Sequence, residues 1–179
     1  AAASSPERRI NTGMGMENST PDKDAETERL RLWLRHMKMA RLVENRLRRL
    51  FRDEFATTVP RFDVLAALNR HPEGLIMSAL SRELKVAASN TTGVVTTLLR
   101  EGMVEQCPVK GDRRASLVRL TPQGRDEFVL QSARLRGWIG TLLSPLDASE
   151  AASVSAAHDR IIAALTEEEG KGNDPSGTA

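Results

Sequence analysis

The chain has 179 residues, of which 40% are apolar and only 3% aromatic, and its formal net charge is +2. These values fit one domain of ordinary size with a core of aliphatic helices, and they disfavour an aromatic-rich sandwich. The single cysteine, Cys107, excludes an internal disulfide framework and fits a reducing cytoplasm. No apolar run approaches the roughly 18 residues that a bilayer span needs, so we expect no membrane partner.

The first long element predicted is an amphipathic helix within residues 25–58. Residues 1–24 lack the apolar segment of a signal peptide, and we expect them to be a disordered leader. From Glu26 to Phe55 there is no proline or glycine, and apolar side chains recur every three or four residues. A helix of about thirty residues spans about 45 Å, more than a domain of this size needs for itself. We therefore expect its apolar stripe to contact a second chain.

Residues 59–121 contain the pattern of a helix-turn-helix. Pro60 opens one helix, and a short helix over residues 78–84 is joined by KVA to another over residues 88–102, which Gly102 ends as a cap. The outer side of this last helix carries small polar groups. Two helices in this arrangement allow the second to enter the major groove of DNA. The predicted inner side of the helix at Pro60 carries Phe62, Leu65, Ala66 and Leu68.

Two strands are predicted next, over residues 103–109 and 116–120, joined by the basic turn KGDRRA. Gly-Asp is suitable turn chemistry for a hairpin. A helix-turn-helix followed by such a hairpin is a winged helix, so the predicted fold class is mostly α (α+β).

Residues 122–168 predict two further helices. Thr121 is a suitable N-cap with Pro122 at the first helical position, and Asp147 with Glu150 approximates a capping box. Residues 169–179 are polar, and we expect a disordered tail.

The segment from about Phe62 to Gly124 resembles the MarR (multiple-antibiotic-resistance regulator) family of bacterial transcription factors. DRRASLVRLT (112–121) is similar to the family's wing signature, and LLREGMVEQ (98–106) to its exit from the recognition helix. The resemblance implies a winged-helix homodimer, with helices 25–58 and 122–168 as its dimerisation region. It also implies a pseudo-palindromic double-stranded DNA operator, bound by a repressor that a small anionic or aromatic ligand releases.

The expected DNA contacts lie on the helix over residues 88–102 and on the wing. Polar helix side chains can reach base edges, while arginines of a wing can reach phosphates or a narrow minor groove. The resemblance implies that Asp112 pairs with an arginine and fixes the shape of the wing. The predicted contact residues are Ser89, Asn90, Thr92, Thr96, Thr97, Arg100, Lys110, Arg113 and Arg114.

Gly93 departs from the family pattern, which often has a larger, basic residue at this place. Glycine inside a helix costs about 1 kcal/mol relative to alanine. Either the main chain approaches DNA closely there, or base recognition depends on Ser89, Asn90 and Thr92.

The ligand pocket of relatives lies where the first long helix and the second helix meet the DNA-binding lobe. An arginine or histidine beside apolar walls suits a small aromatic carboxylate or its thioester. The alternative is that the apolar members are ordinary core and the arginines are solvated. The residues expected at such a pocket are Trp33, His36, Met37, Arg41, Arg61 and Phe62.

Metal, cofactor and catalytic chemistry are not predicted. His36, His71 and His158 are far apart and lack partners at ligand spacing, and no nucleotide-binding or hydrolase motif is present. Cys107 is expected to be an ordinary strand residue. An alternative function remains open, a winged-helix protein–protein interaction module without specific DNA binding, whose affinity for polyanions would not fall steeply with salt.

Overall fold

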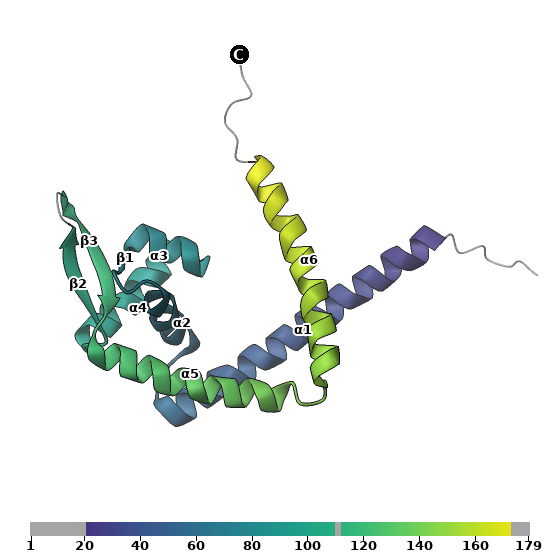
Figure 1. The fold of residues 1–179 in the computed structure, drawn as a ribbon, viewed down its shortest axis with the longest axis horizontal. Coiled ribbons are helices and arrows are strands. Elements are labelled where there is room, and N and C mark those ends of the chain that lie inside the picture. The colour runs from purple at the N-terminus through teal and green to yellow at the C-terminus, as the bar shows by residue number, and fades with distance from the viewer. Residues whose placement is uncertain (1–20, 110–111, 173–179) are drawn as a thin grey trace, which may run out of the picture. The chain divides into compact units, whose positions relative to one another are not determined.

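The computed structural model describes residues 21–109 and 112–172 (Figure 1). The described chain is mostly helical and includes a three-stranded antiparallel sheet, as the sequence predicts for its fold class. It divides into two compact units, one up to Glu44 and one from Asn45 onward, so the division lies within the first helix.

Helix α1 (Pro21–Phe55) begins four residues before the boundary predicted at residue 25, so its first turn lies within the predicted leader. In the first unit its apolar side chains are largely exposed, among them Leu30, Trp33 and Leu34. In the second unit the last part of the same helix carries the fully buried Phe51. The two parts of α1 thus present different surfaces, one open and one packed.

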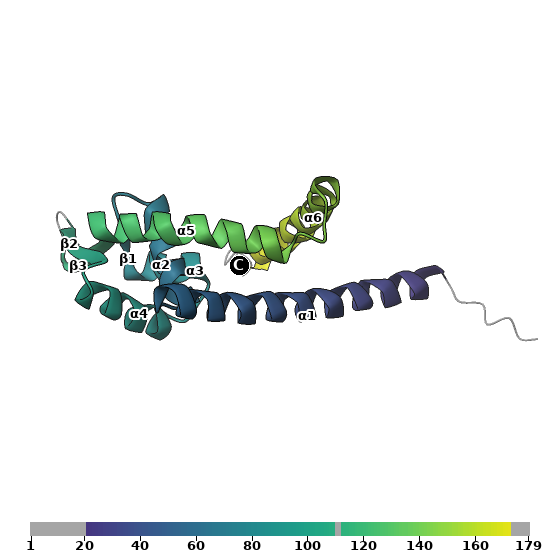
Figure 2. The same cartoon turned by 90° about the horizontal axis from the view of Figure 1, so that it is seen from below.

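Three helices and the sheet form the winged-helix head, Val59–Leu120. Helix α2 (Val59–Arg70) lies between α4 and α5 (Figure 2) and supplies much of the core. Helix α3 (Met77–Leu84) and helix α4 (Ala88–Arg100) pack against it. The prediction for the inner side of α2 is wrong at Ala66, which is half-buried, and misses two buried residues. The buried side chains of α2 are Phe62, Val64, Leu65, Ala67 and Leu68.

The sheet has the order β1-β3-β2, with every pair antiparallel. Strand β2 (Val104–Val109) and strand β3 (Asp112–Leu120) form the predicted hairpin, but β3 includes Asp112–Ala115, which were predicted as turn. Strand β1 (Leu75–Ile76) was not predicted, because two residues are too short for a strand pattern. Pairing of Leu75 with Val118 places β1 beside the hairpin and anchors it to the head.

Two helices follow the head. Helix α5 (Pro122–Leu142) begins as predicted, with the Thr121 hydroxyl accepting a hydrogen bond from the Gly124 amide at 3.0 Å. Helix α6 (Ala148–Gly172) has the predicted capping box, in which Asp147 and Glu150 exchange amide-to-carboxylate bonds of 2.8 and 2.9 Å. It continues to Gly172, beyond the boundary predicted at residue 168.

An aromatic cluster joins the end of α1, the start of α2 and the length of α5. The ring of Phe51 lies 5.1 Å from that of Phe62 and 5.2 Å from that of Trp138, while Phe62 stacks on Phe128 at 5.7 Å. Aromatic pairs at these separations add stability beyond their buried area. The cluster fixes α5 against the head within the second unit.

Candidate nucleic-acid interface

Helix α4 is held against the head by one side only. Its inner side carries Thr91, Val95 and Leu98, which are at most 2% exposed. The turn before it contains Lys85 in the left-handed conformation, with φ of 53°. Its C-terminal end closes at Gly102, with φ of 71°, where the amides of Gly102 and Met103 bond to main-chain carbonyls of the last turn. This cap confirms the predicted end of the helix. The side of α4 opposite the buried residues is left to solvent.

The outer side of α4 carries the residues predicted to contact DNA, and it holds no acidic residue. All of them are exposed except Thr97, which is half-buried. Among the described residues, no hydrogen bond or ion pair engages the side chains of Ser89, Asn90 or Arg100. Two neutral polar groups near one end and one cation at the other are therefore available to a polyanion.

The three threonines on this side use their hydroxyl hydrogens within the helix. Thr92 donates to the Ala88 carbonyl at 2.9 Å, Thr96 to the Thr92 carbonyl at 2.8 Å, and Thr97 to the Gly93 carbonyl at 3.1 Å. A hydroxyl has one hydrogen to donate, so each can only accept further bonds in this arrangement. The sequence alone did not indicate this.

Gly93 lies among these threonines with open space around it. A β-carbon built there meets no heavy atom within 4 Å outside the helix backbone and its chain neighbours. Ser89, Asn90 and Gly93 also border a hollow of about 710 Å³ between α2, α3 and α4. Crowding within the head therefore does not explain the glycine.

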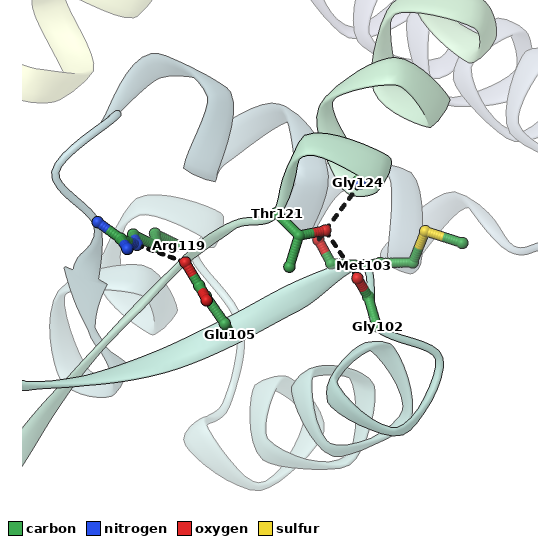
Figure 3. Close-up of polar contacts among 6 residues, drawn as sticks. All are labelled: Gly102, Met103, Glu105, Arg119, Thr121 and Gly124. Atoms are coloured by element: carbon green, nitrogen blue, oxygen red, sulfur yellow. Dashed lines mark hydrogen bonds and ion pairs between the residues drawn. The ribbon is translucent and has the colours of Figure 1, made fainter.

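The wing is described mainly through its main chain. Lys110 lies outside the described residues, and so do the side chains of Asp112, Arg113 and Arg114. Farther down the hairpin, Arg119 donates to Glu105 on the neighbouring strand at 2.7 Å (Figure 3). That hydrogen bond, with the nearby negative charge, raises the pKa of Arg119. This cation has a partner within the wing, so it is not counted among the DNA contacts.

One hydroxyl connects the end of the α4 segment to the start of α5. The Thr121 hydroxyl bonds to the Gly102 carbonyl at 2.7 Å and lies 3.1 Å from that of Met103, while it caps α5 at Gly124 (Figure 3). Gly124 fits closely here, because a β-carbon would lie 1.9 Å from the Met103 oxygen. These bonds hold the start of α5 against the segment that leads into the wing.

The residues predicted to form a ligand pocket occupy different settings. Trp33, Met37 and Arg41 line a hollow of about 330 Å³ on α1, a helix that also carries His36. Phe62 belongs to the aromatic cluster of the second unit. Arg61 forms an ion pair with Glu101, at the end of α4.

A second cavity, of about 240 Å³, lies in the second unit beside Arg61, between the end of α1, α2, the end of α4 and α5. Two of its buried polar atoms, Arg61 Nε and Gln131 Oε1, have no hydrogen-bond partner among the described residues. Gln131 is only 3% exposed. Sequence reasoning missed it, although a glutamine between Phe128 and Leu135 stands on the inner stripe of α5 and was a readable signal.

The described part of the chain has no candidate metal cluster and no candidate membrane span. It contains no group of three or more His, Cys, Asp or Glu side chains that could hold a metal ion, and His71 bonds instead to Glu83 at 2.8 Å. Within the same residues, no helix is long and apolar enough to cross a membrane.

Comparison with known proteins identifies the family. The profile of the MarR family matches residues 57–115. The transcriptional activatory protein BadR of Rhodopseudomonas palustris is 35% identical over 89 residues, which are 48% of this chain and 51% of BadR.

Two solved structures extend the likeness. A MarR family transcriptional regulator from Silicibacter pomeroyi is 30% identical, with a TM-score of 0.67 over 79% of this chain and 98% of that one. The PcaV regulator from Streptomyces coelicolor, solved in complex with its natural ligand, is 26% identical, with a TM-score of 0.55 over 82% of this chain and 94% of that one. These matches include the winged-helix head. The chain belongs to the MarR family of transcriptional regulators.

Proposed function

We propose that this chain is a sequence-specific double-stranded DNA-binding regulator, a homodimer that acts as a repressor and is released by a small ligand. The observation that carries the DNA-binding part is the outer side of α4, which is exposed, lacks acidic residues and ends in the unpaired cation Arg100. A helix held by one side after a short turn can lie in a major groove. We also propose DNA contacts for two arginines of the wing, Arg113 and Arg114, and this part depends on the sequence alone.

The two ends of α4 have different roles in this proposal. Arg100, at the C-terminal end, binds a phosphate and positions the head, as Arg113 does from the wing. Ser89 and Asn90, in the first turn, reach base edges, because the N-terminal residues of a recognition helix lie deepest in the groove. Phosphate contacts add affinity for every duplex, whereas base contacts discriminate between duplexes.

The test is a fluorescence anisotropy titration against the duplex upstream of the chain's own gene, at two salt concentrations, with an unrelated duplex as competitor. Specific binding that weakens steeply with salt supports the proposal. Arg100→Ala should weaken binding to all duplexes equally and reduce the salt slope by about one. Asn90→Ala should instead reduce the difference in affinity between the operator duplex and the competitor duplex.

Arg160→Ala is the matched control, because Arg160 is exposed on α6, which is not part of the winged-helix head. It should leave both the slope and the discrimination unchanged. If Arg100→Ala and Asn90→Ala behave alike, the two roles are wrongly assigned. Binding of equal strength to every duplex, or no salt-sensitive binding, would favour the protein–protein interaction module.

The dimer is supported by apolar side chains that the single chain leaves exposed. They lie on α1 in the first unit and on α6 in the second, and such large exposed sets mark contact surfaces. The residues are Leu30, Leu32, Trp33, Leu34, Met39, Leu42, Val154, Ile161, Ile162 and Leu165.

The ligand part of the proposal places a small organic acid in the cavity of about 240 Å³ beside Arg61. Arg61 Nε lacks an acceptor and Gln131 Oε1 lacks a donor among the described residues, so a ligand that carries both a carboxylate and a hydroxyl satisfies both. Because Arg61 also pairs with Glu101, a bound carboxylate competes with Glu101 and loosens the end of α4. A ligand acts only through such a difference between states.

Benzoate and 4-hydroxybenzoate are suitable probes, with isothermal titration calorimetry and operator release as readouts. Arg61→Gln should abolish binding of both acids. Arg41→Gln, on the α1 hollow, is the matched variant at the other candidate place. If Arg41→Gln abolishes binding while Arg61→Gln retains it, the ligand belongs at α1.

A further inference from the structure

We propose that the middle turn of α4 recognises the C5-methyl groups of pyrimidines, above all thymine, in the major groove. The proposal rests on the DNA-binding function proposed above and names what that surface selects. It concerns Thr92, Gly93, Thr96 and Thr97, which lie between the polar first turn and the terminal Arg100.

The first observation is the set of hydrogen bonds within the helix. Thr92, Thr96 and Thr97 each donate their hydroxyl hydrogen to the carbonyl four residues earlier, at 2.8 to 3.1 Å. With the hydroxyl hydrogen used within the helix, the oxygen can only accept a further bond, and the γ-methyl is the apolar group that each side chain can present. The middle of α4 is therefore an apolar patch of methyl groups, although its residue types suggest hydrogen bonding.

The second observation is the open space at Gly93. Apart from its chain neighbours and the backbone of α4 itself, no heavy atom lies within 4 Å of a β-carbon built there, so crowding gives no reason to exclude a side chain. Apolar groups count as in contact only when their heavy atoms come within about 4.0–4.5 Å. A bare main chain between the threonines lets a base pair come that close.

The third observation is the position of the patch. The same type of hydrogen bond occurs at Thr166 on α6, so the bond alone indicates nothing. On α4, by contrast, three such residues flank a glycine, and two of them, Thr92 and Thr96, lie on the exposed side of a helix that is suited to a major groove. The thymine methyl lies in that groove and contacts threonine methyls there, whereas the minor groove does not display it.

The test replaces thymine by deoxyuridine, one position at a time, in the operator found by the titration above. This change removes a methyl and keeps the base pair. At one or more positions in each half-site we expect affinity to fall about fourfold, the value of one buried methyl. A duplex with a 5-methylcytosine·G pair at such a position should recover part of the affinity that the deoxyuridine duplex loses. This recovery would assign the effect to the methyl group and not to the A·T pair.

Variants at Thr96 identify the protein partner. Thr96→Val keeps a methyl and removes the hydroxyl, so operator affinity should be retained. Thr96→Ser removes the methyl, so affinity should fall for thymine duplexes and show no further fall for the sensitive deoxyuridine duplex. Thr166→Ser is the matched control, because it makes the same change in a residue with the same hydrogen bond on α6, and it should have no effect.

Two results would overturn the inference: deoxyuridine duplexes that all bind like the thymine duplex, or a loss with Thr96→Val that Thr96→Ser does not share. In both cases the protein still binds its operator specifically. Failure of the proposed function is distinct, since then neither the thymine nor the deoxyuridine duplex is preferred to the competitor.

Discussion

Thr91 is a buried residue whose hydroxyl group bears on the stability of the fold. It lies on α4 with 1% of its surface exposed, and its hydroxyl has no hydrogen-bond partner among the described residues. Its neighbours Thr92, Thr96 and Thr97 bond to the main chain, but this one does not. A buried hydroxyl without a partner costs about 1–3 kcal/mol of desolvation.

Thr91→Val should therefore raise the free energy of unfolding by about 1 kcal/mol, because it replaces the unbonded hydroxyl with a methyl of similar size. Urea unfolding followed by circular dichroism measures the change. Val95→Thr, the reverse change at a site 2% exposed on the same side of α4, should lower the stability. A loss with Thr91→Val would mean that its hydroxyl has an unseen partner.

Gly124 has less room for a side chain than the other glycines whose surroundings the structure describes. A β-carbon there would lie 1.9 Å from the Met103 carbonyl oxygen, which is itself held by the Thr121 amide at 3.1 Å. Gly124→Ala should lower the free energy of unfolding by about 3 kcal/mol, the upper end of ordinary overpacking costs. Gly137→Ala, with nothing within 4 Å on the same helix, should raise it by about 1 kcal/mol. Thermal unfolding of both variants is the measurement, and equal shifts would show that α5 can move away from Met103.

At the scale of elements, α2 and α3 are joined by a small cluster of charges. Glu83 on α3 accepts hydrogen bonds from Arg70 at 2.7 and 3.1 Å, and its other oxygen lies 2.8 Å from His71. The bond from Arg70, aided by the charge of His71, lowers the pKa of Glu83 below its ordinary 4.5. A carboxyl with a lowered pKa stabilises the fold above its ordinary value and loses that contribution as pH falls through the lowered one.

Glu83→Gln should cost about 0.5 to 1 kcal/mol at pH 7, since Arg70 is more than half exposed and solvent screens the pair. The difference from the unmodified protein should shrink once the pH falls below 4.5. Urea unfolding at a series of pH values measures it. Glu167→Gln, exposed on α6, is the control and should match the unmodified protein throughout. A cost that stays constant with pH would assign the effect to packing.

At the scale of the whole molecule, the proposed dimer covers the exposed apolar residues of α6. Ile161 and Leu165 are four residues apart, so they lie on one side of the helix, and they are 49% and 56% exposed. The double variant Ile161→Asp/Leu165→Asp should be a monomer that keeps the fold of its winged-helix head. Its operator affinity should fall, because one head binds only one half-site.

Sedimentation equilibrium measures the mass, and circular dichroism confirms that the variant is folded. Ser149→Asp adds a charge at an exposed polar site on the opposite side of the same helix and should stay dimeric. A double variant that remains a dimer would place the interface on α1 alone.

The parts predicted from the sequence were those encoded by local chemistry. Thr121 and Pro122, the Asp147–Glu150 box and Gly102 each specify a helix end through neighbouring atoms, and the structure has all three ends. Strand β1 depends instead on pairing with Val118, more than forty positions along the chain, and two residues carry no periodic pattern.

The candidate site divides in the same way. Which residues of α4 face outward followed from helical spacing, except at Thr97. That the threonine hydroxyls would turn inward did not follow, because residue type does not determine a side-chain torsion. The cavity beside Gln131 needs four segments to meet, and only the folded chain shows that Arg61 and Gln131 border one space.

Because its two ends are held at different places, α5 can transmit a small rotation from its middle to the start of the wing. Its 21 residues form a rod about 31 Å long, clamped to the wing at one end and joined through Trp138 to the aromatic cluster near the other. Gln131 lies near the middle of α5, so α5 would tilt about this point if the proposed ligand bound beside it. A tilt of about 5° there, over half the rod, moves each end by more than 1 Å in opposite directions, as the length of the helix requires. If the proposed ligand binds beside Gln131 and tilts α5 in this way, it shifts the start of the wing without unfolding any element.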